Sequence, residues 1–485
     1  MAVFTKNRLA HAISASLPLA LGLSLSGCGD DNLNPDDIGA PDTYNFSSQT
    51  SRSGESSVDY RDAITRLVLI KELEYLIGSQ FLQDYATGKT KEEVVALLNR
   101  VYTSGTTSLA TNNIYDLHDP EDKEAAGPTP INGLTLMSGL NLQQTHFNQL
   151  SPNINLSSAM PGKAYDLHYI DGNEKIAFLG WSISGVTDEN DMPEAMIQQW
   201  FGVIADLAID GDSTTKFIHT NSGRDYQKLI STFLLGAIAY GQSVNLHLNE
   251  GLYSENSNGT SDLNYTPLQH NWDMAYGYYG ATRQLIQLTK EQTQNQPDHN
   301  YEGGDIDIFS EYTFDYPRDA AKRDLGTALY NTNFYGNPMQ AFLNGRQLID
   351  SYFPDNTSNN PELLLDLDIQ KNIIIDQWEK SITATAIHYI NETAESVLYY
   401  GQVAILDAEY FKDWSRAKGY LLALQFNPNT KIGYADYKEL HNLLGAGPEL
   451  DPNPRDLYKY SGKMSSTHTI FQSSYGFSTN NIQEW

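Results

Sequence analysis

The chain has one cysteine, Cys28, among 485 residues. A single thiol cannot form a disulfide within the chain, and it cannot supply a thiolate zinc site or the ligands of an iron–sulfur cluster. The fold must therefore be held by a packed apolar core. Any bound metal must use His, Asp, Glu or backbone oxygen as ligands.

Cys28 lies directly behind a short hydrophobic segment. Two cations precede an apolar run over residues 13–25, which is too short to span a bilayer and has the layout of a secretory signal. Residues 25–28 read Leu-Ser-Gly-Cys and resemble the lipidation site of bacterial lipoproteins. The resemblance implies a leader over residues 1–27, cleavage before Cys28, and an acylated cysteine that anchors the protein permanently. An ordinary secretory signal is the alternative.

The residue after the cysteine bears on the destination of the protein. In lipoproteins of Gram-negative cells, an aspartate at this place favours retention in the inner membrane, whereas this chain has Gly29. We therefore expect attachment to the outer membrane of a Gram-negative cell envelope. The periplasmic and the surface face both remain open.

The charge of the chain limits its partners. Loss of the leader removes Lys6 and Arg8 and takes the formal net charge from −29 to −31. Such an acidic body is repelled by nucleic-acid phosphates, so we expect no nucleic-acid partner. No second hydrophobic run of spanning length follows the leader, so we expect a water-soluble body that is tied to the membrane only through its anchor.

The pattern of apolar residues predicts an anchored helical protein. Residues 28–59 are acidic and Ser-rich, which predicts a tether. From residue 60 on, apolar residues recur at steps of three and four, which predicts helices. The predicted helices cover residues 60–87, 90–102, 191–208, 224–241, 267–289, 319–331, 338–353, 361–398, 408–424 and 435–444. Residues 103–190 are rich in Gly, Pro and Asn, which predicts loops with at most a small hairpin around residues 171–173.

The predicted fold class is an all-α, multi-helix body over residues 60–485. Two packed helical bundles, with halves at 60–295 and 296–485, are an alternative to a single body. Long polar loops are expected at 242–265 and 295–317. The Ser-, Asn- and aromatic-rich tail from residue 461 to the end is expected to lie across the surface.

One block of sequence resembles a known family. Residues 268–280 read LQHNWDMAYGYYG and resemble a family of bacterial lipoproteins catalogued as domain of unknown function 4856. Other blocks that resemble this family are residues 44–46, 229–240, 378–390, 426–428 and 443–445. The resemblance covers nearly the whole mature chain. It implies a secreted, anchored, helical protein without an assigned reaction.

A second resemblance is to the imelysin-like helical lipoproteins, which are associated with iron uptake. That family carries a His-x-x-Glu pair on a bundle helix. The counterpart here is His270 with Asp273, where aspartate replaces glutamate. The resemblance implies a helical lipoprotein connected with iron.

The predicted helix over residues 267–289 carries two distinct faces. His270, Asp273, Gly277 and Gly280 fall on one stripe, because they step by three and four. An interior glycine costs about 1 kcal/mol relative to alanine, so two glycines on this stripe indicate close approach of another helix or of a ligand. The candidate ligand-lining residues of this helix are Trp272, Tyr276, Gly277 and Gly280.

A second polar stripe, on the predicted helix over residues 361–398, carries His388 and Glu392. If the two helices meet, His270, Asp273, His388 and Glu392 form a ligand set of the kind that helical bundles use for iron, zinc or manganese. The alternative is that the first pair is a hydrogen-bonded pair near a helix start, while the second stripe is a solvated face.

The sequence favours binding over catalysis. It contains no Gly-x-Ser-x-Gly, His-Glu-x-x-His or phosphate-loop motif, so enzymatic activity is unsupported. The first hypothesis is a lipid-anchored envelope protein that captures a metal ion or a metal complex related to iron uptake. The alternatives are an envelope scaffold that docks a protein partner through the loops at 242–265 and 295–317, and a metal-dependent hydrolase with Asp273 or a nearby glutamate as base.

Overall fold

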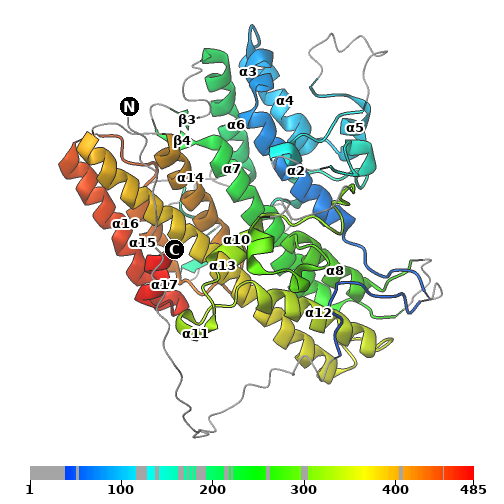
Figure 1. Cartoon of the computed structure of the whole chain (residues 1–485). Coiled ribbons are helices and arrows are strands. Elements are labelled where there is room, and N and C mark those ends of the chain that lie inside the picture. Colours follow the sequence, from blue (N-terminus) through cyan, green and yellow to red (C-terminus); the bar gives the residue numbers. More distant parts are fainter. Residues whose placement is uncertain are drawn as a thin grey trace, which may run out of the picture. The chain divides into compact units, whose positions relative to one another are not determined.

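The computed structural model describes residues 39–50, 54–115, 128–136, 141–161, 169–171, 174–176, 178–181, 193–211, 218–219, 222–257, 263–295, 304–403, 408–451 and 453–485. These residues belong to one compact unit, on both sides of residue 295. Almost all of the described regular structure is helical (Figure 1). The expected all-α body is therefore confirmed. The predicted leader over residues 1–27 and the lipidation site at Cys28 lie outside the described residues.

The elements follow one another in chain order. The helices up to residue 294 are α2 (Arg61–Gly78), α3 (Gln80–Ala86), α4 (Lys91–Thr103), α5 (Thr106–Thr111), α6 (Pro193–Asp210), α7 (Tyr226–Leu234), α8 (Pro267–Tyr279) and α9 (Lys290–Gln294). The later helices are α10 (Asp315–Arg323), α11 (Thr327–Tyr330), α12 (Gly336–Ser351), α13 (Pro361–Val403), α14 (Ala408–Ala423), α15 (Tyr434–Leu444), α16 (Pro454–Tyr475) and α17 (Thr479–Glu484).

Short elements complete the described structure. The antiparallel pairs are β1 (Tyr169–Asp171) with β2 (Glu174–Ile176), and β3 (Ile218–His219) with β4 (Arg224–Asp225). Single 3₁₀ turns are η1 (Gly133–Leu136), η2 (Phe147–Gln149), η3 (Ser157–Ala159), η7 (Gly251–Tyr253), η8 (Leu285–Gln287) and η9 (Leu424–Phe426). The pairing of β1 with β2 confirms the small hairpin that was predicted around residues 171–173.

Local capping explains the boundaries of the first helices. Ser79 takes an extended conformation that ends α2, and its hydroxyl accepts a hydrogen bond from Leu82 N to begin α3. The helix predicted over residues 60–87 is thus two helices. Thr90 and Glu93 form a capping box at the start of α4, because each side chain satisfies a backbone N–H that the helix leaves without a partner.

The helix that begins at Tyr226 is longer than predicted. It continues past α7 as π-helical turns, η5 (Leu235–Tyr240) and η6 (Gln242–Glu250), so the long loop expected at 242–265 is wrong over its first half. Val244 and Leu248 are buried, and these two side chains hold the polar segment against the core. By length and composition this helix could cross a membrane, but most of its apolar stretch is buried inside the body, as in a core helix of a soluble protein.

α8 is shorter than predicted. It ends at Tyr279, because Gly280 takes a left-handed conformation with φ of +81°, which glycine adopts without steric cost. The helix expected over residues 267–289 therefore stops one residue before its second glycine, Gly280. Gly280 closes the helix from the left-handed position and does not lie in its interior.

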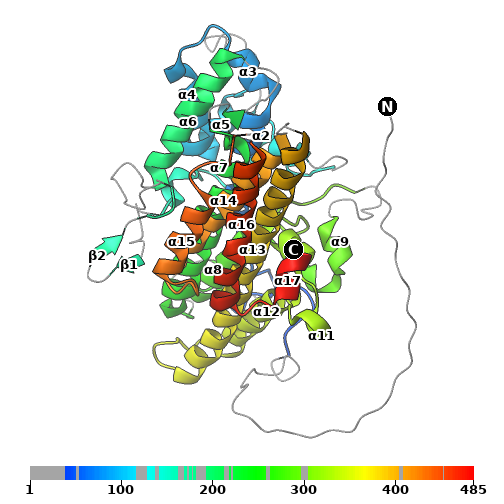
Figure 2. The ribbon, with the colours of Figure 1, turned by 90° about the vertical axis from the view of Figure 1, so that its left-hand side faces the viewer.

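α13 lies at the centre of the second half of the chain. It packs against α10, α12, α14 and α16, and Figure 2 shows α13, α14, α15 and α16 side by side. Most of the predicted surface tail forms α16 and α17, which are exposed on one face and packed on the core with the other. Phe471 and Ile482 are buried there, and Trp485 Nε1 donates a hydrogen bond to the carbonyl of Arg323.

A buried carboxylate joins the last helices to the core. Glu379 of α13 accepts hydrogen bonds from the hydroxyls of Tyr240 and Tyr475, both at 3.0 Å. It also accepts from Thr430 Oγ1 at 2.8 Å and from Lys431 N at 2.9 Å. Buried polar groups need such partners, so this cluster fixes the register of α16 against α13.

Part of the predicted tether is packed into the body. Tyr44, Phe46 and Val58 are buried, and Ser57 N donates to the carbonyl of Phe46 at 2.9 Å. The boundary placed at residue 59 is therefore too late. A few apolar side chains in an otherwise polar stretch are enough to dock it.

Glu72 should make stability depend on pH. Its carboxylate is fully buried on α2, and burial raises its pKa from 4.5 to about 7, although Tyr115 and the N–H of Gly133 donate to it. The folded protein keeps a proton that the unfolded chain releases, so this contribution to stability is complete below about pH 4.5 and is lost as the pH rises through 7. Between pH 4 and pH 8, the free energy of unfolding of the native protein should fall by about 3 kcal/mol more than that of Glu72→Gln. Urea unfolding at each pH measures the difference.

The matched control is Glu439→Gln, which removes an exposed acid on α15. This variant should keep the pH dependence of the native protein. An unchanged slope in Glu72→Gln would contradict the assignment.

Candidate functional site

The block LQHNWDMAYGYYG forms α8, and its first turn is fixed by local chemistry. Thr266 Oγ1 accepts from Gln269 N at 3.2 Å, while Gln269 Oε1 accepts from Thr266 N at 2.8 Å. Pro267 occupies the first helical position, where no N–H is needed. This start places Asp273 one turn further along, on the face that points into the core.

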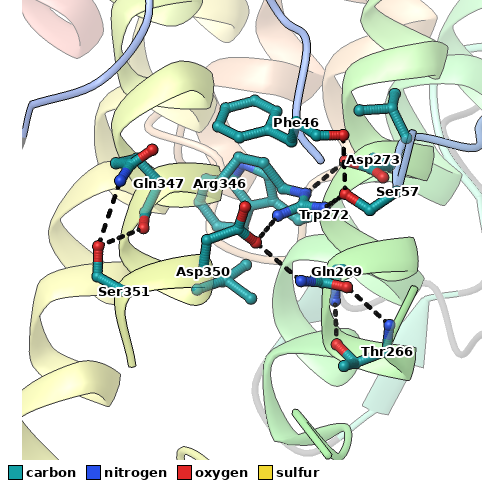
Figure 3. A network of polar contacts seen from close by, with 12 residues as sticks. Phe46, Ser57, Thr266, Gln269, Trp272, Asp273, Arg346, Gln347, Asp350 and Ser351 are labelled. Carbon is teal, nitrogen blue, oxygen red and sulfur yellow. Dashed lines mark hydrogen bonds and ion pairs between the residues drawn. The ribbon is translucent and has the colours of Figure 1, made fainter. Parts of the chain in front are cut away.

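A fully buried arginine on α12 pairs with Asp273. Arg346 Nε lies 2.9 Å from Asp273 Oδ1, and its Nη1 contacts Asp350. Its Nη2 donates to Ser57 Oγ at 2.6 Å, so Figure 3 shows Arg346 surrounded by Asp273, Asp350 and Ser57. Gln269 donates to Asp350 at 2.8 Å and joins the start of α8 to the same cluster. These residues form the Arg346 network.

The Arg346 network holds the N-terminal segment in place. The Tyr44 hydroxyl donates to Asp273 Oδ1 at 2.9 Å, and its ring stacks on Tyr276 with centroids 3.7 Å apart. The Arg346 guanidinium lies 4.8 Å from the centre of the Phe46 ring. Cation–π contact and stacking both favour this arrangement. Three segments that are distant in the chain therefore meet at one ion pair.

One arginine faces two buried carboxylates in the network, and the pKa values of both carboxyl groups are raised. Burial lowers the pKa of Arg346, but Asp273 and Asp350 raise it by more, so its net pKa shift is upward. Burial raises the pKa of Asp273, while Arg346 and the Tyr44 hydroxyl oppose the rise. A buried charge is tolerated only when it is paired and hydrogen-bonded, and each partner here supplies that compensation to the other.

The structure does not assemble the predicted metal site. Asp273 is engaged by Arg346, and His270 stacks on Tyr265 with ring centroids 4.6 Å apart. His388 Nδ1 lies 2.7 Å from the carbonyl of Trp485 and must carry the proton, because a carbonyl only accepts. Among the described residues, no three His, Cys, Asp or Glu side chains are grouped so that they could hold a metal ion.

The surroundings of His388 and Glu392 differ from those expected. Burial lowers the pKa of His388 to about 4, with a further lowering from nearby Arg323. Glu392 is exposed on α13. The alternative of a solvated face therefore describes Glu392 but not His388, which joins α13 to the C-terminal residue.

The predicted ligand-lining residues of α8 are core residues. Trp272 Nε1 donates to the carbonyl of Phe342 at 2.9 Å, and the Tyr276 hydroxyl donates to the carbonyl of Thr282 at 2.7 Å. A Cβ at Gly277 would lie 2.7 Å from Cβ of Tyr60. The close approach inferred from the glycines is thus correct, but the approaching groups are Tyr60, the N-cap of α2, and Ala63 of α2 in the same chain. Gly280 meets Phe314 in the same way.

An open pocket of about 390 Å³ lies beside this network, and we name it the Tyr265 pocket. Residues between 56 and 61, residues 263–265, Arg283, Asp307 and Phe309 line it. The N–H of Asp59, at its edge, donates to Asp273 Oδ2 at 3.3 Å. One wall of the pocket is therefore attached to the Arg346 network.

The charges in the Tyr265 pocket cancel. Arg61 pairs with Asp59 at 3.2 Å, while Asp307 accepts from Gln144 at 2.8 Å. Arg283 Nε donates to the Tyr60 hydroxyl at 3.0 Å. Two cations and two carboxylates thus line a pocket with no net charge, and each already has a fixed partner.

The pocket also offers rings and an unused acceptor. Tyr60, Tyr265 and Phe309 are among its lining residues, although Tyr60 is almost completely buried. Asn264 Oδ1 is buried and has no hydrogen-bond partner among the described residues, although the same side chain donates to Glu55. A buried acceptor without a partner is costly, so this oxygen is a ready hydrogen-bond position for a bound molecule.

Sequence reasoning missed this pocket because its residues come from the predicted tether, from two predicted loops and from two predicted helices that no local pattern brings together. Tyr265 stands one residue before the cap of α8, and Phe309 lies in the polar stretch expected at 295–317. An aromatic residue within a polar loop, next to the most specific sequence block, is a signal that could have drawn attention to Tyr265.

Comparison with known proteins supports the resemblance to the domain of unknown function 4856 over part of the chain. Residues 188–317 match the family model of the domain of unknown function DUF4856, which confirms the resemblance over that segment. The match includes α8, Tyr265, Arg283 and Phe309. No curated protein and no solved structure shows a significant match to the chain.

The Arg346 network should dominate local stability. Asp273→Asn should lower the free energy of unfolding by about 3–5 kcal/mol, because the substitution leaves the buried Arg346 with one of its two carboxylates. Urea unfolding followed by circular dichroism measures the change. The neighbouring control is Gln347→Ala on α12, whose amide only contacts exposed Ser351 and which should change stability by less than about 0.5 kcal/mol. Equal effects of the two variants would contradict the role of the ion pair.

Proposed function

Because residues 188–317 match a family whose function is unknown, we propose a function from the geometry of the site. The chain is a lipid-anchored binding protein of the cell envelope. Its Tyr265 pocket takes a small, uncharged, polar molecule with a flat apolar face, such as a sugar ring. The observation that carries this proposal is an open, charge-balanced pocket with three aromatic rings and a buried unused acceptor.

The size and lining of the pocket support a small organic ligand. A volume of about 390 Å³ falls within the range of ordinary ligand pockets, which combine aromatic walls with a few fixed polar groups. A sugar ring presents an apolar face to an aromatic ring and hydroxyls at its edge. Tyr265 offers such a ring, while Asn264 Oδ1 and the Arg61–Asp59 pair offer hydrogen-bond positions.

The absence of net charge separates this ligand from an ion. A charged molecule needs an excess of opposite charge to replace its hydration, whereas the charges of this lining are already paired with each other or with neighbouring polar groups. An uncharged ligand loses less hydration on entering. The proposal therefore excludes a bare metal ion as the natural ligand of the Tyr265 pocket.

The pocket is supported by a rigid base. The Arg346 network ties the segment around Asp59 to α8 and α12, so the lining is positioned before a ligand arrives. A preorganised site loses less conformational entropy on binding. Asp273 itself is fully buried and hydrogen-bonded, which argues against its use as the base of a hydrolase.

Binding is tested on the purified lipidated chain in detergent. An array of neutral oligosaccharides first identifies a saccharide that the native protein binds. Titration calorimetry then compares the affinity of the native protein for that saccharide with the affinities of Tyr265→Ala and Tyr458→Ala. Tyr458 is 72 % exposed and lies on α16, outside the pocket, so it is a matched control for loss of an aromatic side chain. Tyr265→Ala should weaken binding about fivefold or more, since one aromatic contact contributes about 1 kcal/mol.

Two results would refute this ligand class. One is a native protein that binds no neutral saccharide on the array. The other is equal affinity in the native protein and in Tyr265→Ala.

The anchor is tested separately at Cys28. Cells fed with labelled palmitate should incorporate the label into the native chain and into none of the Cys28→Ser protein. The native chain should sediment with outer membranes, whereas the variant should remain in the soluble envelope fraction or keep an uncleaved leader. Association of an unlabelled, leader-cleaved Cys28→Ser protein with the outer membrane would contradict the lipid anchor.

A further inference from the structure

A second cavity, of about 290 Å³, has the opposite electrostatic character to the rest of the molecule. We name it the Lys228 cleft. Five of its thirteen lining residues are cations, whereas Lys and Arg make up 31 of the 485 residues of the chain. The cations are Lys71, Lys228, Arg318, Lys322 and Arg416. Three carboxylates also line the cleft, so its lining has a formal charge of +2 in a chain of −29.

The cleft has fewer carboxylates than cations, so its ion pairs share carboxylates. Glu74 accepts from both Lys228 at 2.7 Å and Lys71 at 3.3 Å, and Lys71 also pairs with Asp315 at 2.6 Å. Burial raises the pKa of Glu74, but the two lysines outweigh it and lower the pKa to about 2. One carboxylate thus serves two cations. The lining itself therefore has two more cations than carboxylates, and Arg416 is paired with Asp413 outside the lining.

The other cations are held in position by their neighbours. Arg416 pairs with Asp413 at 2.9 Å, and its guanidinium lies 5.2 Å from the centre of the Tyr389 ring. Asp413 occupies Nη1, and a guanidinium has five N–H donors, so the fork keeps donors for a further acceptor. Lys322 lies 3.7 Å from Asp319 with its side chain 40 % exposed, which leaves its ammonium group accessible.

The cleft is built on packed helices. Its lining comes from α2, α7, α10, α13 and α14, together with one residue of η5. These helices pack directly against one another, with α7 on α2 and α14, and α13 on α10 and α14. The cations are therefore arranged by the core and not by mobile loops, which suits a site that must hold like charges close together.

One acceptor in the cleft has no partner. Asp315 Oδ1 takes the hydrogen bond from Lys71, while Asp315 Oδ2 is buried without a partner among the described residues. A phosphate or a phosphate monoester can carry a proton near neutral pH, and can donate it to such an oxygen. Sulfate carries no proton at that pH and would only meet repulsion there.

We propose that the Lys228 cleft binds a phosphate group, as inorganic phosphate or as the monoester of a small molecule. Lys228, Lys322 and Arg416 supply charge and N–H donors to its oxygens, and Asp315 accepts a hydrogen bond from the protonated oxygen of the phosphate. Charge excess makes the cleft selective for anions, and the acceptor makes it selective for phosphate over sulfate. The site is independent of the Tyr265 pocket, because the two share no lining residue.

The test uses the full-length protein at low ionic strength, where charge interactions are strongest. Titration calorimetry measures binding of inorganic phosphate, glycerol 3-phosphate and sulfate. The native protein should bind the first two at least about tenfold more tightly than sulfate. Tighter binding of glycerol 3-phosphate than of inorganic phosphate would assign the site to a monoester, and the reverse would assign it to the free ion.

Variants identify the cleft as the place of binding. Lys322→Gln is partly exposed and should fold normally, and it should weaken phosphate binding about tenfold. The matched control is Lys412→Gln on α14, which removes the same charge from a residue that pairs with Glu409 outside the cleft. The control should change the affinity by less than about twofold.

Asp315→Asn tests the selectivity. It should reduce the preference for phosphate over sulfate, and urea unfolding shows whether the variant is folded. No phosphate binding by the native protein, equal weakening by Lys322→Gln and Lys412→Gln, or equal affinity for phosphate and sulfate would each overturn the proposal.

Discussion

The structure depends on one buried ion pair, between Arg346 of α12 and Asp273 of α8. Neither charge is tolerated in a dry core unless the other is present, so the two helices and the N-terminal segment must come together in one arrangement. Tyr44 and Ser57 complete the hydrogen bonds of this pair. The pair therefore specifies where the second half of the predicted tether, which contains Tyr44 and Ser57, joins the body, and it fixes one wall of the Tyr265 pocket.

The two cavities show how one acidic chain can present different chemistry at different places. In the Tyr265 pocket the cations and carboxylates are paired with each other or with neighbouring polar groups, and the lining has no net charge. In the Lys228 cleft one carboxylate is shared by two lysines, and positive charge is left over. The net charge of the chain predicts neither environment, because local pairing decides it.

The sequence predicted helices well where a periodic apolar stripe had a clear cap. The capping box of Thr90 and Glu93 and the cap at Thr266 are both formed. The sequence did not predict the helical segments η6 and α16, in which a few buried apolar side chains pack an otherwise polar segment against the core. It also failed for the metal site, since helical periodicity places His270 and Asp273 on one face but does not reveal that Arg346 is the partner of Asp273.

The sequence by itself determined the all-α class, most helix positions and the absence of disulfide chemistry within the chain, because these follow from local periodicity, capping and the count of one cysteine. Only the tertiary structure decided which polar residues pair. Arg346 lies 73 residues after Asp273, and Glu74 lies 154 residues before Lys228. Such pairs depend on how helices pack, and no local spacing encodes them.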